Sequence, residues 1–253
     1  MINRRYGWLR DLPDFRDHQF LAVRALMASP RPSSVDLSPQ CPPVYDQGAL
    51  GSCTANAIAG ALEFDRLRQG LADFTPSRLF IYYNERAMEG TVPYDNGAQI
   101  RDGIKSVDQY GDCPESEWPY DPSQFAVTPP AQCYSDALKY KAVKYAAIAQ
   151  NLDDMKACLA SGFPFVFGFT VHRSFESAEV AQTGVANLPG WFDPTLGGHA
   201  VLCVGYDDAA KRFKCRNSWG PDWGDKGYFT MPYDYLSNPK LSSDFWVINL
   251  VAA

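Results

Sequence analysis

The chain has 253 residues, a hydrophobic content of 46% and a formal net charge of -6. This acidic balance argues against a nucleic-acid-binding protein, which would need a basic face to offset phosphate charge. No apolar stretch approaches the roughly 20 residues that a membrane span requires. We therefore expect a globular protein, a monomer that binds neither nucleic acid nor membrane, with enough apolar residues for one large domain or two lobes.

Residues 1–36 differ in charge from the rest of the chain. They contain six arginines and four aspartates but no lysine or glutamate, which gives this segment +2 and leaves -8 for the remainder. The segment ends in "ASPRPSSVD", whose prolines and serines indicate a linker. We predict an N-terminal extension over 1–36 and one domain over 37–253. The first residues lack the apolar core of a secretory signal, so we expect no export signal in them.

The front half has the signals of helices. A first helix is predicted to begin at the "SC" of "SCTANAIAGALEFDRLRQG" and to end near Gly70. A second should have Thr75 as its cap, Pro76 as its first residue and Gly90 as its stop. A third, weaker pattern extends over 100–111.

The back half has the signals of strands. Short aromatic and β-branched runs are separated by turn residues, namely "FPFVFGFTV", "HAVLCVGYDD", "RFKCRNSW", "GYFTM" and "DFWVINL". One short helix is expected over 152–161. The predicted fold class is α+β, with a mainly helical lobe over about 46–146 and a mainly antiparallel β lobe over about 147–253. A site between the lobes would draw residues from both.

The chain contains an odd number of cysteines, seven, so at least one thiol stays outside any intramolecular disulfide. The absence of a C-x-x-C pair makes a zinc ribbon or thioredoxin-type motif improbable. Cys53 stands out because the predicted helix begins there. A helix N-terminus carries partial positive charge, which favours the thiolate and so a nucleophilic role.

A thiol nucleophile needs a base, and the chain has three histidines. His199 is favoured because it opens a predicted strand directly after Gly197 and Gly198, which allow a substrate or another backbone to approach closely. The imidazole needs a partner for its other nitrogen, and Asn217 in "CRNSWG" can supply a neutral carbonyl. Trp219 could shield that hydrogen bond from water, although simple packing is an alternative.

With these elements in place, the chain resembles the papain family of cysteine peptidases. The resemblance rests on "DQGALGSC", "GGHAVLCVGY" and "NSWGPDWGDKGYF", which give Gln, Cys, His and Asn in the family's order and anchor it over roughly 35–250. His199 follows Cys53 by 146 residues and Asn217 follows it by 164, the second being somewhat beyond the expected range. The stretches "YGWLRDLPDFRD" and "PPVYDQGALGSCTANA" further resemble the family's bacterial branch.

The resemblance implies a two-lobe fold with a cleft and a set of catalytic roles. Cys53 would attack a peptide carbonyl, His199 would transfer the proton and Asn217 would orient the imidazole. Gln47 would donate to the oxyanion together with the backbone N–H of Cys53. A thiolate–imidazolium pair is the resting state that the resemblance implies, in an endopeptidase that needs no cofactor or metal and takes peptide or protein substrates.

The chain also departs from the family pattern. Leu50 and Thr54 stand where the family has a disulfide-bonded cysteine and an aromatic residue, so that disulfide is not expected and the case for secretion weakens. In "DNGAQ" the second glycine of the family's substrate-binding pair is Ala98. We expect Gly97 and Ala98 to line the cleft, with an ordinary Asn-Gly turn as the alternative. Gly198 and Trp219 complete the predicted substrate-binding residues.

The extension is too short and too rich in proline to form the helical core of the family's longer propeptides. We expect it to act as a short inhibitory segment over the cleft, because its charge is opposite to that of the body. Its apolar side chains need burial as well. These side chains are Tyr6, Trp8, Leu9 and Phe15. The alternative is a disordered tail.

Three other functions compete with a peptidase. A thiol acyltransferase would also combine Cys with His, but its histidine is usually oriented by Asp instead of Asn. A peptide-binding relative without activity would be expected to lack the nucleophile. A metal site made of His199, Cys203 and Cys215 is the weakest alternative, since Cys203 and Cys215 are better explained as core residues.

Overall fold

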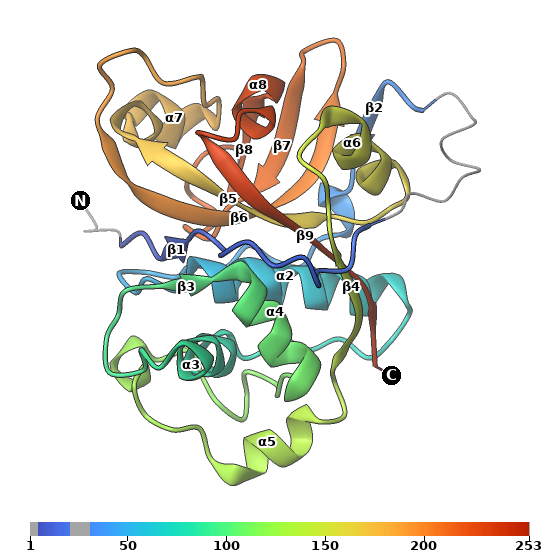
Figure 1. The fold of residues 1–253 in the computed structure, drawn as a ribbon, viewed down its shortest axis with the longest axis vertical. Coiled ribbons are helices and arrows are strands. Elements are labelled where there is room, and N and C mark those ends of the chain that lie inside the picture. Colours follow the sequence, from blue (N-terminus) through green and yellow to red (C-terminus); the bar gives the residue numbers. More distant parts are fainter. Residues whose placement is uncertain (1–4, 21–30, 253) are drawn as a thin grey trace.

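The computed structural model describes residues 5–20 and 31–252, and it separates into a helical half and a β half that meet along α2 (Figure 1). The α-helices are α2 (Cys53–Arg68), α3 (Arg78–Glu89), α4 (Ile100–Gln109), α5 (Ala131–Ala137), α6 (Leu152–Ala160), α7 (Ala178–Thr183) and α8 (Tyr233–Ser237). Helices α3, α4 and α5 lie on one side of α2, and the large sheet with α6, α7 and α8 lies on the other (Figure 1). The fold class is α+β, with a helical half and an antiparallel β half, as the sequence predicts.

The β half is built on one antiparallel sheet. Its strands are β2 (Ser34–Asp36), β4 (Ala142–Ala147), β5 (Phe165–His172), β6 (Thr195–Asp207), β7 (Arg212–Arg216), β8 (Tyr228–Pro232) and β9 (Ser242–Val251). The order is β4-β9-β5-β6-β7-β8, with β2 paired to β6 beside this path. Two short strands, β1 (Trp8–Leu9) and β3 (Ala98–Gln99), form a separate parallel pair.

Helix α2 is buried on all sides along most of its length. Every residue from 53 to 66 is buried, because the helix is covered by helices of its own half and by β6 and β9 of the sheet. Small residues such as Ala57 and Gly60 allow these neighbours to pack closely. A helix enclosed in this way fixes its first residue, Cys53, between the two halves.

Strand β5 shows why the sheet is stable. Phe165, Phe167 and Phe169 alternate along it and are fully buried on one face. The ring of Phe167 stacks on that of Phe245 in β9 with centroids 5.6 Å apart. The opposite face of the strand carries Gly168, where the indole of Trp8 fills the space a side chain would take. The sheet core and the N-terminal segment therefore meet at β5.

The sequence located most of these elements but misplaced one helix start. The predicted cap Thr75 and first residue Pro76 are wrong, since α3 begins at Arg78 with Ser77 as its cap. The Ser77 hydroxyl accepts the N–H of Phe80 at 3.2 Å, the contact that an N-cap requires. Gly90 ends the helix in a left-handed conformation, as expected.

The N-terminal segment follows the junction between the halves (Figure 1). It enters at β1, pairs there with β3, and reaches the far end of the junction where Gln19 bridges to Ala147. The predicted linker ends in strand, because Ser34–Asp36 forms β2 and pairs with Asp207–Gly205 of β6. In the described ranges 5–20 and 31–252, no helix has both the length and the apolar character needed to cross a bilayer.

Candidate active site

Cys53 occupies the first position of α2 and is fully buried. The N-terminal turn is held by Asn56, whose backbone N–H donates to the carbonyl oxygen of Ser52 at 3.0 Å. The Asn56 side chain also donates to the Ser52 hydroxyl at 3.0 Å. The thiol therefore lies at the positive end of the helix dipole, as the sequence predicts.

His199 lies on β6 and is joined to Asn217, which follows β7. The Nε2 atom of His199 and the Oδ1 atom of Asn217 are 2.8 Å apart, and both residues are buried. The Trp219 ring stacks on the imidazole at 4.8 Å between centroids, with 23° between the planes. This indole covers the hydrogen bond from solvent, which strengthens it.

The helix and the strand meet at the Cys53 sulfur. Burial raises the pKa of Cys53 to about 12, and hydrogen bonds from the backbone N–H groups of Ala200 and Gly7 oppose this rise. Ala200 is the residue after His199, so the thiol lies beside the strand that carries the imidazole. With Gly7 also at the sulfur, burial in this closed arrangement disfavours the thiolate.

Gln47 is fixed at both its backbone and its side chain. Its N–H donates to the Ser218 carbonyl at 2.9 Å, and its Oε1 accepts the Ser218 hydroxyl at 2.6 Å. Its Nε2 donates to the Leu50 carbonyl at 2.9 Å. These contacts assign oxygen and nitrogen of the amide and turn its N–H₂ group toward the loop that precedes Cys53.

Gly97 and Ala98 contact the N-terminal segment. The Ala98 N–H donates to the carbonyl oxygen of Gly7 at 2.8 Å. A Cβ on Gly97 would lie 1.9 Å from the same oxygen, so the two backbones touch. This pairing uses the backbone groups that an extended peptide would use.

Gly198 and Trp219 also contact that segment. A Cβ on Gly198 would lie 2.5 Å from the carbonyl oxygen of Trp8. The Tyr6 ring packs edge-on to Trp219 with centroids 6.5 Å apart, and to His199 at 6.3 Å. The structure therefore brings the predicted catalytic and substrate-binding residues to one place, with residues 6–8 lying over them.

Two further residues support the site and were missed by sequence reasoning. Ser218 orients the Gln47 amide, and its position between Asn217 and Trp219 in the "NSWG" motif could have suggested this. Tyr120 donates its hydroxyl to the Gln47 carbonyl at 3.0 Å and lies 2.5 Å from the Ser52 hydroxyl. Tyr120 is 73 residues from Gln47 in the chain, and no local pattern signals the contact.

A metal-ligating group is found away from this site. Within residues 5–20 and 31–252, side chains suited to hold a metal come together at Cys113, Glu117 and Cys133. Cys203 and Cys215 lie opposite each other in β6 and β7 and are buried core residues. They do not join His199 in a metal-ligating group there.

A family description, "Papain family cysteine protease", matches residues 31–244 of the chain. The chain belongs to this family. It is therefore a cysteine protease, a hydrolase, and the expected membership is confirmed.

Solved and curated relatives of the protease agree with this assignment. Xylellain, a cysteine protease from Xylella fastidiosa, is 48% identical, covers 97% of this chain and 96% of its own, and superposes with a TM-score of 0.91. This similarity confirms the bacterial branch. A peptidase C1-like protein of Acanthamoeba polyphaga mimivirus is 43% identical over 99% of this chain and 88% of its own length. A procathepsin B from Trypanosoma congolense shares the fold, at 19% identity and a TM-score of 0.76 over 94% of this chain and 84% of its own.

The raised pKa of Cys53 leads to a prediction about its reactivity. In the full-length native protease at pH 7, iodoacetamide should alkylate Cys53 at least about 100-fold more slowly than in the urea-unfolded chain, because little thiolate forms and the sulfur is covered. Mass-mapped alkylation over time gives both rates. Modification of Cys53 before any other cysteine, at pH 6, would contradict the covered, neutral thiol.

Proposed function

We propose that this protease is an endopeptidase whose nucleophile is Cys53, and that its N-terminal residues block the cleft until they are displaced. The observation that carries this proposal is the arrangement around the Cys53 sulfur. The thiol lies at the start of α2, beside the strand that holds the His199–Asn217 pair, and beneath the backbone of Gly7.

The first step would activate the thiol once the cleft is open. Asn217 holds Nε2 of His199, which leaves Nδ1 to take the proton of Cys53. Removal of Gly7 would let water and substrate reach the sulfur and relieve its desolvation. The helix dipole and the imidazolium would then favour the thiolate, and the resting ion pair would form.

The second step would be attack on a peptide carbonyl. The new C–S bond places negative charge on the carbonyl oxygen, which the Gln47 amide and the Cys53 backbone N–H would stabilise. Because Ser218 and Leu50 hold the Gln47 amide, this donor would need no reorganisation during the reaction. His199 would then protonate the leaving amine, and an acyl-enzyme would remain.

The last step would hydrolyse the acyl-enzyme. His199 would take a proton from water, and the hydroxide would attack the thioester carbonyl. The Cys53 sulfur would then leave as the thiolate, the carboxylic acid product would be released, and the proton held by His199 would restore the ion pair. Trp219 remains over the imidazole through the cycle and keeps bulk water from the His199–Asn217 bond.

The path of the N-terminal segment supports endopeptidase action. Gly7 lies at the Cys53 sulfur, Tyr6 before it lies by Trp219, and Trp8 and Leu9 after it pair with β3. An extended chain therefore fits on both sides of the nucleophile. A protease that cleaves within a chain needs this continuity.

The inhibitory role is supported by how firmly the segment is held. Trp8 is 7% exposed, and its Nε1 donates to Asp244 at 2.9 Å. Arg5 forms an ion pair with Asp95 at 3.0 Å. The group that the segment turns to the Cys53 sulfur is the N–H of Gly7, which cannot undergo nucleophilic attack. A chain bound in this way would cover the nucleophile without being its substrate.

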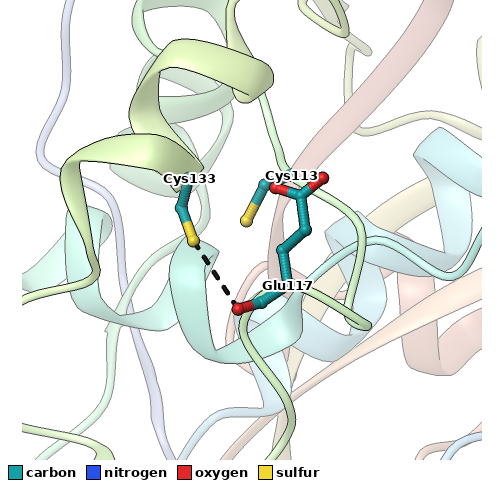
Figure 2. A group of neighbouring side chains, drawn as sticks. All are labelled: Cys113, Glu117 and Cys133. Carbon is teal, nitrogen blue, oxygen red and sulfur yellow. Dashed lines mark hydrogen bonds between the residues drawn. The ribbon is translucent and has the colours of Figure 1, made fainter.

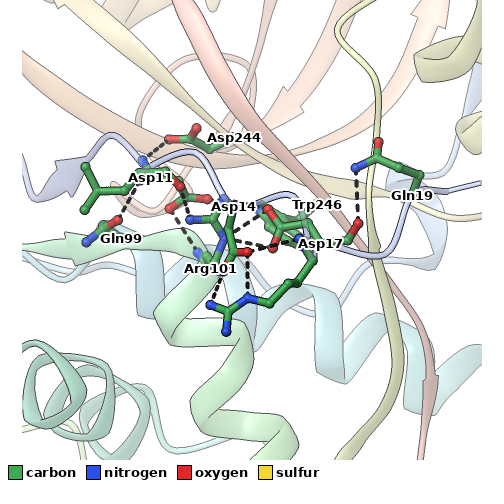
Figure 3. Close-up of polar contacts among 10 residues, drawn as sticks. Asp11, Asp14, Asp17, Gln19, Gln99, Arg101, Asp244 and Trp246 are labelled. Atoms are coloured by element: carbon green, nitrogen blue, oxygen red, sulfur yellow. Dashed lines mark hydrogen bonds and ion pairs between the residues drawn. The ribbon is translucent and has the colours of Figure 1, made fainter.

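A polar network continues this anchoring beyond Trp8 (Figure 3). Asp11 accepts the indole N–H of Trp246 at 2.9 Å and the backbone N–H of Arg101 at 3.2 Å. The Arg101 guanidinium pairs with Asp17 at 2.6 Å. Asp11 also lies close to Asp244, which accepts its backbone N–H at 2.9 Å. The network joins the segment to both α4 and β9.

The burial expected of the segment's apolar side chains holds for Trp8 but is wrong for two others. Leu9 is 43% exposed and Phe15 is 99% exposed. In the extended segment adjacent side chains point to opposite faces, so Leu9 points away from the cleft that Trp8 fills. Phe15 lies in a turn at the surface. The segment is held by Trp8 and by polar contacts instead.

The proposed oxyanion donor can be tested by truncating its side chain. Gln47→Ala should lower kcat by about 10²–10³ and leave KM within a few-fold, because the amide acts on the transition state. The matched control is Gln40→Ala, at an exposed position of another turn, which should retain full activity. Steady-state kinetics on a fluorogenic peptide measure both. Equal losses in the two variants would contradict the role of Gln47.

The blocking role can be tested by a single methyl group. A Cβ on Gly7 would lie 1.6 Å from the carbonyl oxygen of Gly51, so Gly7→Ala should lift the segment from the cleft. We expect kcat/KM of the full-length protein to rise at least about tenfold. The control is Gly190→Ala, where an added Cβ meets nothing within 4 Å, and it should leave kcat/KM unchanged. An unchanged kcat/KM in a folded Gly7→Ala protein would contradict the blocking role.

The segment should be released more readily as the pH rises. Burial, with Asp244 close by, raises the pKa of Asp11 from 3.8 to about 7 in the docked segment. The docked form therefore keeps a proton that the free segment loses, and docking weakens as the pH rises from about 4 to 7.

The Asp11→Asn substitution removes this titration, so comparing the variant with the wild type measures the effect of the Asp11 proton on docking. The ratio of kcat/KM between the wild-type and Asp11→Asn proteins cancels the pH profile of the chemistry itself. We expect it to rise by about tenfold or more between pH 5 and pH 7 and to level off above that. A ratio that is constant or falls over this range would show that the Asp11 proton does not control docking.

A further inference from the structure

Two cysteines lie side by side at the ends of a 21-residue stretch of the helical half, the segment 113–133 (Figure 2). Cys113 is fully buried, and Cys133, in α5, is 2% exposed. Their sulfur atoms lie within 4.8 Å of each other and of a carboxylate oxygen of Glu117. With Phe80 and Ala137 they form a small apolar cluster apart from the main core.

We propose that Cys113 and Cys133 are a redox modification site, at which a small disulfide oxidant such as oxidised glutathione closes the segment 113–133 with an intramolecular disulfide. The two sulfur atoms already lie within 4.8 Å of each other, so closing the bond requires them to approach by no more than about 3 Å. Both cysteines are free in this structure.

The surroundings of the two sulfurs favour a disulfide over a bound metal ion. Burial raises the pKa of both thiols, and the carboxylates of Asp112 and Glu117 act on Cys113 in the same direction. A metal site would require both sulfurs as thiolates. A disulfide is uncharged and apolar, and it suits a cluster formed with Phe80 and Ala137.

The reaction balances as two exchanges. A transient thiolate of Cys133 attacks one sulfur of the oxidant, forms a mixed disulfide and expels one glutathione thiolate. Cys113 then gives up its proton and attacks the Cys133 sulfur, which expels the second glutathione. The two protein thiols lose two electrons and two protons, and the oxidant becomes two thiols. Cys133 is the expected first nucleophile, because a hydrogen bond from Cys113 lowers its pKa against the effect of burial.

Access to Cys133 follows from its position. Helix α5 has seven residues and lies at the edge of the helical half, far from the sheet (Figure 1). A short helix at an edge opens locally at small cost, which would admit the oxidant. Cys203 and Cys215 are also neighbours, opposite each other in β6 and β7, but they lie within the sheet core. They provide an internal comparison for selectivity.

The bond would steady a segment that supports the active site. Between the two cysteines, Glu115 pairs with Arg78 at 2.7 Å and the Trp118 carbonyl accepts the Ser77 hydroxyl at 2.7 Å. Tyr120, in the same segment, holds the carbonyl of Gln47. Closing the segment restricts the unfolded chain and so stabilises the folded one.

The test begins with the full-length Cys53→Ala protein, in which no self-cleavage can occur. Incubation with oxidised glutathione, trapping with N-ethylmaleimide and peptide mapping should find Cys113 joined to Cys133, with loss of 2 Da and with Cys203 and Cys215 still free thiols. Free Cys113 and Cys133 after oxidation would overturn the proposal. So would tight binding of Zn²⁺ that protects both thiols and prevents the cross-link.

Thermal unfolding supplies the second measurement. The oxidised protein should unfold roughly 5–10 °C above the reduced protein, as expected for closure of a loop of this length. Cys133→Ser should abolish the difference, whereas Cys41→Ser, at a half-buried thiol elsewhere, should retain it. If the Cys133→Ser protein does not fold, the peptide mapping described above still shows whether the disulfide forms, because it needs no substitution at Cys133. Equal unfolding temperatures of the cross-linked and reduced proteins would overturn the stabilising role.

Discussion

The contact between the start of α2 and the start of β6 is the constraint on which the site depends. It places a thiol supplied by the helical half beside the strand that supplies the imidazole, and the Ala200 N–H at the Cys53 sulfur marks where they meet. The contact persists because α2 is enclosed by both halves. A buried helix cannot turn or slide without disturbing the core, so the thiol is held by the packing of the whole protein.

In the proposed latent form, the N-terminal segment would act on this constraint through solvation. A covered sulfur loses water, so the same contact that would activate Cys53 in an open cleft would disfavour its thiolate when Gly7 lies above it. The segment's own carboxyl, Asp11, experiences the same effect beside Asp244. The proposed latency would then have one physical origin, the removal of water from ionisable groups at the junction of the two halves.

The sequence could predict what local patterns encode. Helix caps, apolar periodicity and the motifs around Cys53, His199 and Asn217 are all local, and the structure brings these residues together. The sequence alone could not predict contacts between distant turns, such as that of Tyr120 with Gln47. The prediction also failed at the start of α3, where Pro76 and Ser77 give competing local signals for the first turn. It failed again at Leu9, because composition does not say which face of an extended segment is buried.

A crystal structure of the full-length protein with a peptide aldehyde would show whether Cys53 is the nucleophile that the N-terminal segment covers. We expect a hemithioacetal on Cys53 whose oxygen lies about 2.7–3.1 Å from Nε2 of Gln47. We also expect that residues 5–9 have left the cleft and that the aldehyde peptide pairs with Gly97 and Ala98 in their place. An aldehyde bound to Cys53 with Trp8 still against Gly168, or one attached to another residue, would contradict this expectation.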